Sequence, residues 1–294
     1  MAGAPATADN VSGRPRRTAA TRFDRRQLLK ALVGVGLGAA TGGGAHGFLY
    51  ERHHLELTRA AFPIAGLPPA LRGLRIGVIT DTHRSQTVSH ETIAAAVSML
   101  MAERPDLILL GGDYVTRRDA RYVQPAADVL APLSAPHGVI AILGNHDDER
   151  DMPAALAAKG FTVLKDARTR LKMRGEVMDF AGIRYWTNKV ADIARVMRGS
   201  VPHAILLAHT PRRLLEAQQL ALPAVISGHT HGGQIVLPGI GPIAARQFPV
   251  VAGMERHDGT TIFVSRGVGT VFLPIRVNCP PEVAVLTLDS LTRG

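Results

Sequence analysis

The sequence contains a single cysteine, Cys279, so no disulfide can form within one chain. An oxidising compartment would therefore leave the covalent structure of the protein unchanged. We expect Cys279 to be a small, buried, apolar residue close to the last strand and not a reactive thiol.

Charged residues are also few, at 20% of the chain, whereas apolar residues make up 46%. This composition excludes a disordered polyampholyte, and it suffices for one large domain with a substantial core or for two small ones. No internal repeat is visible. Thirty glycines and nineteen prolines indicate a loop-rich α/β protein.

An excess of charge of one sign is nearly absent from the body of the chain. The net charge is +10, but residues 1–50 contain seven basic and two acidic residues, which leaves 27 basic and 22 acidic residues in the remainder. The body is thus mildly basic. Such a charge fits an anionic substrate or a membrane surface and does not demand nucleic acid.

The first fifty residues have the pattern of an export signal. Residues 1–22 show no apolar periodicity, and we expect disorder there. Arg25 and Arg26, followed by one residue, two leucines and a lysine, resemble a twin-arginine signal. Residues 31–50 carry no acidic or basic residue apart from His46, and their seven glycines argue against an ordinary membrane helix.

This leader predicts export through the twin-arginine translocase to the outer side of a cytoplasmic membrane. Sites of the small-x-small type at 38–40 and 45–47 permit cleavage, while an uncleaved membrane anchor remains the other option. We therefore expect a leader over residues 1–50 and one catalytic domain over residues 51–294.

Short apolar runs alternate with helical patterns from residue 51 onwards. The predicted strands cover 74–80, 107–110, 138–143, 161–164, 177–180, 183–186, 204–208, 224–227, 261–265 and 283–288. The predicted helices cover 89–103, with Ser89 as N-cap, and 119–131, 152–159, 190–198 and 211–220. Strand–helix alternation followed by a strand-rich half predicts two packed sheets with helices outside them.

Five polar clusters each directly follow one of these apolar strands. They are Asp81-Thr82-His83, Gly112-Asp113, Gly144-Asn145-His146-Asp147, His209 and Gly228-His229-Thr230-His231. Sites in open α/β sheets form outside the carboxyl ends of the strands, so we expect the clusters to converge. Together they supply enough oxygen and nitrogen ligands for two metal ions, and Gly228, Gly232 and Gly233 allow the tight turns that bring alternate histidines to the site.

With these motifs in this order, the chain resembles the calcineurin-like metallophosphoesterase superfamily over about residues 70–290. The resemblance implies an α/β (α+β) fold, a four-layer αββα sandwich of two mixed sheets flanked by helices, with a dinuclear metal site at the carboxyl ends of strands. It also implies roles for individual residues: Asp81, His83 and His231 as ligands of the first metal, Asp113 as the bridging carboxylate, Asn145, His209 and His229 as ligands of the second metal, and His146, held by backbone and by Asp147, beside the leaving group.

The resemblance implies a hydrolase. Two cations would bind phosphate oxygens and lower the pKa of a bridging water, so that a hydroxide attacks phosphorus while His146 stabilises or protonates the leaving oxygen. Imidazole and carboxylate ligands without a thiolate favour Mn, Fe or Zn.

A narrower resemblance concerns a bacterial branch of exported or membrane-associated phosphohydrolases. It rests on Gly112–Val115, Gly228–Gln234 and Arg276–Glu282. It leaves open a general phosphodiesterase, including one that takes a lipid-linked phosphate ester, and a UDP-2,3-diacylglucosamine pyrophosphatase of lipid A metabolism. Export favours envelope phosphodiesters over the second, whose chemistry is cytoplasmic.

Two alternatives come from other classes. One is a catalytically inactive, membrane-associated metal-binding protein, although every expected ligand position is filled. The other is a nucleic-acid enzyme, which the mild charge of the body and the export signal disfavour.

Contacts to the substrate are less specified by the sequence. Arginines near the metal motifs suit phosphate, and we take Arg84, Arg117 and Arg266 as candidates. Residues 237–243 could form an apolar rim for a lipid tail or an ordinary loop. Trp186 ends an apolar run, and we expect it in the core.

Replacing Arg25 and Arg26 together by lysine should abolish export, because the predicted signal depends on the paired arginines. Fractionation of a bacterial host that produces the full chain, followed by immunoblotting, measures this. The matched control is the double lysine variant of Arg16 and Arg17, an arginine pair with no apolar run directly after it. Undiminished export of the Arg25/Arg26 variant would contradict the twin-arginine assignment.

Overall fold

The computed structural model describes residue 38 and residues 41–291. The expected disorder of residues 1–22 and the arginine pair therefore lie outside the described residues. The unit that carries the body is Gly43–Gly294, and it begins with helical residues up to residue 49. Among the described residues, no helix combines the length and apolar character needed to cross a bilayer.

The first sheet has six strands in the order β1-β14-β2-β3-β4-β5. These are β1 (Glu56–Ile64), β14 (Glu282–Ser290), β2 (Arg75–Ile79), β3 (Leu107–Leu110), β4 (Val139–Ala141) and β5 (Thr162–Val163). Strands β2 to β5 are parallel, and β14 pairs antiparallel to β2 and parallel to β1. The carboxyl ends of β2, β3 and β4 thus meet at one edge.

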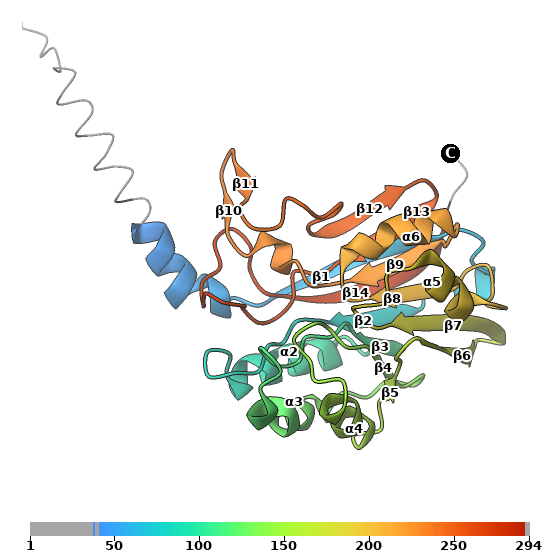
Figure 1. Ribbon diagram of the computed structural model, residues 1–294, viewed down its shortest axis with the longest axis horizontal. Coiled ribbons are helices and arrows are strands. Elements are labelled where there is room, and N and C mark those ends of the chain that lie inside the picture. Colours follow the sequence, from blue (N-terminus) through green and yellow to red (C-terminus); the bar gives the residue numbers. More distant parts are fainter. Residues whose placement is uncertain (1–37, 39–40, 292–294) are drawn as a thin grey trace, which may run out of the picture. The chain divides into compact units, whose positions relative to one another are not determined.

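The second sheet also has six strands, in the order β12-β13-β9-β8-β7-β6. These are β12 (Gly253–His257), β13 (Thr260–Val264), β9 (Ala224–Ser227), β8 (Ile205–Ala208), β7 (Glu176–Ile183) and β6 (Ala167–Met173). Its four inner strands are parallel, and its two edge strands are antiparallel to their neighbours. A short hairpin of β10 (Val236–Leu237) and β11 (Gly241–Pro242) stands apart from both sheets (Figure 1).

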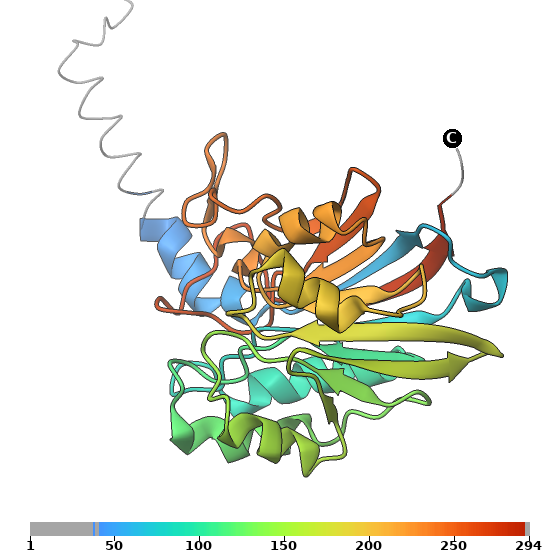
Figure 2. The same cartoon turned by 45° about the vertical axis from the view of Figure 1, so that its right-hand side comes forward.

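Helices cover the outer face of each sheet (Figures 1 and 2). The first sheet carries α2 (His90–Ala102), α3 (Val123–Leu130) and α4 (Asp151–Ala157); the second carries α5 (Val190–Met197) and α6 (Leu214–Gln219). The short helical turns are η1 (Glu51–His53), η2 (Pro69–Leu71), η3 (Ala120–Tyr122), η4 (Pro211–Arg213) and η5 (His231–Gly233). This arrangement confirms the predicted class of two mixed sheets flanked by helices.

The apolar core between the sheets takes residues from both. Alternate residues of one strand serve different layers: in β3, Leu107 and Leu109 pack between the sheets, while Ile108 and Leu110 pack under the helices. Such a strand is buried on both faces, which is why it reads as a continuous apolar run. In β2, Gly77 leaves the space that Leu100 of α2 fills.

Several predicted elements are confirmed, and one residue is misplaced. Ser89 caps α2 by accepting the N–H of Thr92. The two strands predicted at 177–180 and 183–186 are one strand, β7, followed by a turn in which Thr187 N–H donates to the Arg184 carbonyl at 3.0 Å. Trp186 lies in that turn with 58% of its surface exposed, so its expected place in the core is wrong.

Besides the short strands β10 and β11, three strands at sheet edges escaped prediction. Strands β1, β6 and β12 carry charged side chains among their exposed positions, and each pairs with one neighbouring strand only. Strand β1 pairs with β14 over nine positions that are more than 200 residues apart. Sequence periodicity does not report such long-range pairing.

At the edge of the second sheet, the buried carboxylate of Asp179 in β7 binds two arginines of the edge strand β6. It accepts two hydrogen bonds of 2.9 Å from Arg170 and one of 2.9 Å from Val201 N–H, it forms an ion pair of 2.7 Å with Arg168 Nη1, and its side chain is fully buried. Burial opposes its charge, but the bonds from Arg170 and Val201 outweigh burial and hold the pKa of Asp179 below its usual range.

The substitution Asp179→Asn should lower the free energy of unfolding by about 2 kcal/mol at pH 7, because it removes a buried charge that two arginines face. A depressed pKa contributes stability above the unfolded value of about 3.9, so the difference from wild type should shrink as the pH falls below about 4. Urea unfolding at pH 7 and pH 3.5 measures both effects. The control is Asp192→Asn, which breaks an exposed pair with Arg195 and should cost less than about 0.5 kcal/mol. Equal losses in both variants would contradict the structural role of Asp179.

Candidate metal centre

The polar clusters predicted at strand ends converge where the two sheets meet. Several of their residues have a left-handed backbone, which costs a non-glycine residue energy and turns its side chain away from the strand direction. Their φ angles are 53° at Asp81, 46° at His83, 56° at Asp113, 72° at His229 and 51° at His231. Tight turns were expected only at glycines, so the backbone strain at the ligands themselves is a finding of the structure.

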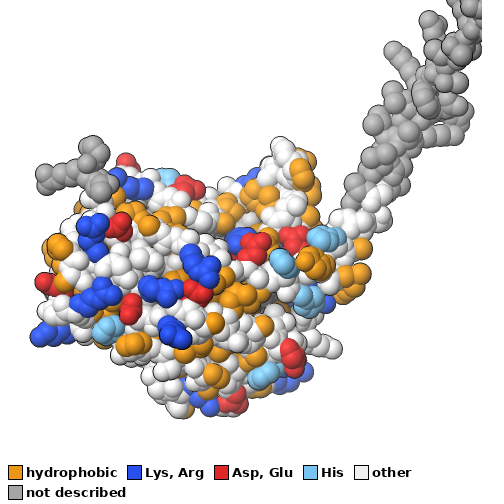
Figure 3. Space-filling model, turned by 180° about the vertical axis from the view of Figure 1, so that it is seen from behind, with side chains coloured by type: hydrophobic (Ala, Val, Ile, Leu, Met, Phe, Trp, Pro, Cys, Tyr) orange, Lys and Arg blue, Asp and Glu red, His pale blue; other side chains and the backbone are white. Residues whose placement is uncertain are grey.

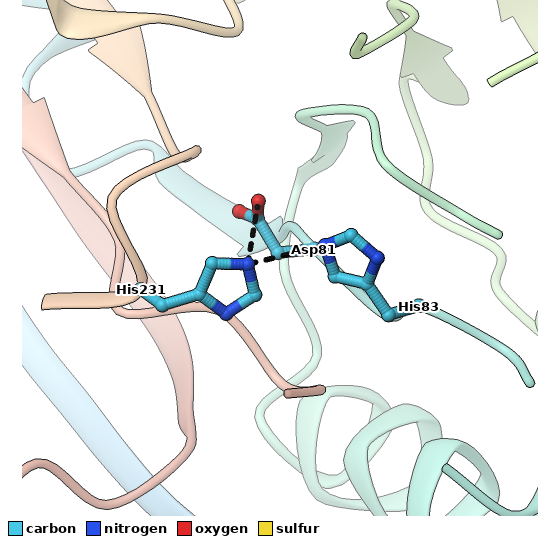
Figure 4. Close-up of side chains that lie close together, drawn as sticks. All are labelled: Asp81, His83 and His231. Carbon is cyan, nitrogen blue, oxygen red and sulfur yellow. Dashed lines mark hydrogen bonds and ion pairs between the residues drawn. The ribbon is translucent and has the colours of Figure 1, made fainter. Parts of the chain in front are cut away.

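The first ligand group consists of Asp81, His83 and His231. Their donor atoms lie within 4.8 Å of one another, and all three residues are buried. His83 Nε2 lies 3.1 Å from His231 Nε2, which in turn lies 3.5 Å from Asp81 Oδ1 (Figure 4). This set is the one expected to hold the first metal.

The second group consists of Asp113, His209 and His229, again within 4.8 Å. His209 Nε2 lies 3.1 Å from Asp113 Oδ2 and 3.2 Å from His229 Nδ1. The same Asp113 oxygen lies 3.6 Å from Nε2 of His83, a member of the first group. Asp113 therefore stands where a carboxylate can reach both groups, as expected for a bridging ligand.

The pKa values of these groups follow from their burial and from the charges around them. Burial lowers the pKa of His83 to about 4 and that of His229 to about 3, so both imidazoles are neutral at pH 7 and have a free lone pair. Burial opposes a charge on Asp113, but His209 and His83 outweigh it and hold the pKa of that carboxyl well below its usual range. In the same way, burial opposes protonation of His209, yet the carboxylates of Asp113 and Asp81 raise its pKa to about 10. His209 therefore carries a proton at pH 7 that it must lose to become the ligand of a cation.

A pair of divalent cations fits these residues. The imidazole nitrogens of each group lie about as close together as hydrogen-bonded atoms, at 3.1 Å and 3.2 Å. A neutral imidazole has only one N–H, so not all of these nitrogens can donate. Asn145 Oδ1 is buried and has no hydrogen-bond partner within the described residues, which fits an oxygen that binds a cation. The donors are imidazole, carboxylate and amide oxygen, which suit Mn, Fe or Zn.

Glycine is required beside both carboxylates. A Cβ at Gly144 would collide with the carboxylate of Asp113, and one at Gly228 would collide with that of Asp81. Of the two, only Gly228 was expected to give a tight turn. Their direct effect is to let the two anionic ligands approach the neighbouring main chain.

Arg276, to which the sequence analysis gave no role, supports the first group from behind. It is fully buried, and its Nη2 donates to the carbonyls of Arg266 (2.8 Å), Gly267 (3.0 Å) and Gly269 (2.6 Å). Gly267 in turn packs against Asp81. The signal in the sequence was a single charged residue between two β-branched ones, Ile275 and Val277, in a segment without other charge.

His146 lies beside the ligand groups and belongs to neither. Its Nδ1 accepts the N–H of Arg117 at 2.9 Å, its own N–H donates to Asp113 Oδ1 at 2.8 Å, and its ring stands edge-on to His83 at 4.9 Å. Asp147 differs from expectation. Its carboxylate accepts main-chain N–H groups of Asp113, Tyr114 and Gly144, so it holds the loop of the bridging aspartate and not the His146 ring.

Of the three candidate substrate arginines, the structure brings one to the site. The Arg84 guanidinium donates to the carbonyls of Ser85 and Val88. That of Arg266 pairs with Glu56 at 3.0 Å and Glu282 at 3.2 Å. Arg117 is exposed, and its guanidinium lies 5.6 Å from the Phe272 ring at the mouth of the site. Cys279 is buried, as expected, and donates its thiol to the His231 carbonyl.

A cavity of about 440 Å³ opens over the ligand groups. Its floor includes His83, Asp113, Asn145, His146 and His229. This volume is that of a pocket for a small organic molecule, larger than a phosphate group requires.

Comparison with known proteins agrees with this geometry. The family profile described as calcineurin-like phosphoesterase matches residues 74–233, which contain every predicted ligand. The chain belongs to this family. As a member, it is a metallophosphoesterase, and thus a hydrolase.

Three relatives illustrate the similarity. The chain is 31% identical to the uncharacterized metallophosphoesterase YkuE of Bacillus subtilis (strain 168), over 92% of this chain and 99% of that protein. It is 30% identical to the phosphodiesterase YaeI of Escherichia coli (strain K12), over 73% of this chain and 82% of that protein. It is 29% identical to an uncharacterized metallophosphoesterase of Aquifex aeolicus (strain VF5), over 83% and 95%.

Calorimetric titration of metal-stripped protein with Mn²⁺ should give two ions per chain, one for each ligand group. Asp113→Ala should weaken both sites, by at least about 100-fold, because its carboxylate reaches both groups. His257→Ala, which removes an exposed histidine paired with Glu255, should change neither. Two unaltered sites in Asp113→Ala would contradict the bridging position.

Proposed function

We propose that this metallophosphoesterase is a phosphodiesterase that acts on the outer side of a cytoplasmic membrane. The observation that carries the proposal is the position of Asp113 between the two ligand groups, with His146 beside them and outside them. When bound, a pair of divalent cations supplies Lewis-acid stabilisation of charge on phosphate oxygens and activates water.

The first ligand group and the second would hold one cation each, with Asp113 shared and Asn145 completing the second. In the net reaction one ester P–O bond breaks and the oxygen of water forms a new P–O bond. The two protons of water end on the released alcohol and on the phosphate product. The residues of this chain bind the phosphate, orient it and stabilise the leaving oxygen.

His146 has a defined tautomer for that last task. Because Arg117 N–H donates to Nδ1, that nitrogen is unprotonated, and in the neutral ring Nε2 carries the hydrogen. Burial lowers the pKa of His146, which favours the neutral ring at pH 7. We infer that His146 stabilises the leaving oxygen by donating a hydrogen bond from Nε2.

Support for a diester substrate comes from the relative named as a phosphodiesterase. Support for export comes from the twin-arginine pattern at Arg25 and Arg26, which implies the twin-arginine translocase as a partner. A pyrophosphate substrate such as UDP-2,3-diacylglucosamine would need the same ligand groups, and it stays the alternative.

His146→Ala should lower kcat for bis-p-nitrophenyl phosphate by about 10²–10⁴-fold in Mn²⁺-loaded protein, because the leaving oxygen loses its donor. Metal content should stay at two ions per chain, since His146 belongs to neither group. Plasma emission spectrometry and steady-state kinetics measure the two quantities, with His257→Ala as the control. Full activity of His146→Ala would contradict its role. Wild-type protein that binds two ions and hydrolyses no phosphate ester would favour the inactive metal-binding alternative.

A further inference from the structure

We propose that the substrate is an amphiphilic phosphodiester, whose alkyl or acyl chain lies in the outer part of the cavity while its phosphate reaches the ligand groups. The proposal rests on the phosphodiesterase function given above and names the class of substrate. The substrate's alkyl or acyl chain comes from a lipid surface, and the mouth of the cavity lies against that surface.

The cavity has a polar floor and an apolar outer wall. Above the ligand groups it is lined by Ile235, Ile243, Ala245, Phe248, Val271 and Leu273. Among its described lining residues the only carboxylate is that of Asp113, which belongs to the metal centre. A phosphate group alone would leave this wall without a partner, whereas a hydrocarbon chain would cover it.

The apolar wall continues onto the surface as a rim, which we define as Ile240, Ile243, Phe272 and Leu273. These side chains are 60%, 56%, 73% and 55% exposed. Hydrophobic side chains gather on the protruding β10–β11 hairpin in Figure 3. Ile243, Phe272 and Leu273 also line the cavity, and Ile240 lies between β10 and β11. Exposed apolar residues gathered beside an active site mark an interaction site.

Hydrogen bonds hold the main chain of the rim in a defined conformation. Gln234 holds it with both ends of its amide: Nε2 donates to the Leu273 carbonyl at 2.8 Å, and Oε1 accepts the N–H of Val271 at 3.0 Å. Phe272, between these two bonds, has a φ of 61°, a strained conformation for a bulky residue. Strain that keeps an aromatic ring exposed has no explanation in core packing.

Hydrogen bonds also stiffen the hairpin. Arg246 Nε donates to the Pro242 carbonyl at 2.9 Å, and Nη2 donates to the Ile240 carbonyl at 2.8 Å. Arginines therefore flank the apolar side chains, with Arg117 over Phe272 and Arg212 over Phe248 as further cases. Apolar residues flanked by guanidinium groups suit the boundary between acyl chains and anionic headgroups.

The segment behind the rim connects it to the start of the body. Val277 N–H donates to the Gln234 carbonyl at 3.0 Å, and Arg276 N–H donates to the Gly47 carbonyl at 3.2 Å. Gly47 precedes Phe48 and Leu49, which are 39% and 72% exposed. Further exposed apolar residues thus lie next to the segment that supports the rim. This favours a lipid surface as the source of the substrate's alkyl or acyl chain.

The test compares p-nitrophenyl methyl phosphate with p-nitrophenyl dodecyl phosphate, each kept monomeric, in Mn²⁺-loaded full-length protein. We expect kcat/KM to be at least about tenfold higher for the dodecyl ester. In the double variant Ile243→Ser and Leu273→Ser this ratio should fall to near one. Leu215→Ser, which alters an exposed leucine of α6 away from the cavity, should leave the ratio unchanged.

Calorimetry with metal-free protein supplies a readout that does not depend on turnover. Dodecyl phosphate should bind more tightly than methyl phosphate to wild type, and the double variant should lose this difference. Cleavage of the methyl ester with no preference for the longer chain would overturn the substrate class and leave the phosphodiesterase intact. Cleavage of neither ester would instead refute the phosphodiesterase function.

Sedimentation with vesicles of phosphatidylglycerol tests the lipid source. Full-length wild type should sediment more than full-length protein carrying Ile240→Ser, Ile243→Ser and Leu273→Ser, since both retain the same leader. Equal sedimentation would overturn the lipid surface as the source. A persistent preference for the dodecyl ester would then identify a soluble amphiphile as the substrate.

Discussion

The carboxylate of Asp113, buried among imidazoles, is the contact on which the rest of the structure depends. It lies 3.1 Å from His209 and 3.6 Å from His83, and so joins a ligand of one group to a ligand of the other. A carboxylate in such a place would be costly without opposite charge. Protonated His209 can supply that charge, and bound cations would replace it, since His209 loses its proton when it becomes a ligand.

This contact joins the two sheets. Asp81, Asp113 and Asn145 follow strands of the first sheet, whereas His209 and His229 follow strands of the second. The apolar core between the sheets therefore sets the distance between ligands that come from opposite halves of the chain. Because close-packed cores resist deformation, the site is organised by packing that lies outside it.

Around the metal centre, the loops that follow the strands have separate tasks. Asp147 gathers main-chain N–H groups and holds the Asp113 loop, Arg276 gathers carbonyls behind Asp81, and Gln234 fixes the apolar rim. In each case one polar side chain satisfies main-chain groups that have no sheet partner. The strained φ angles at the ligands can persist because these bonds define the loops so completely.

Read from the sequence, the motifs and their order predict the family by resemblance, and the resemblance implies the layered fold and the two ligand groups. That these motifs converge could be predicted because each directly follows an apolar strand and strand ends meet at one edge. Tertiary structure alone decided the partners of Asp147, the exposure of Trp186, the edge strands such as β1, and the place of Arg276. It also turned Arg84 and Arg266 away from the cavity and set an apolar rim beside it. The physical reason is the distance along the sequence over which the determining contacts act. A strand and the motif that follows it depend on residues that are near in the sequence. Hydrogen-bond partners and exposure depend on residues that only folding brings together.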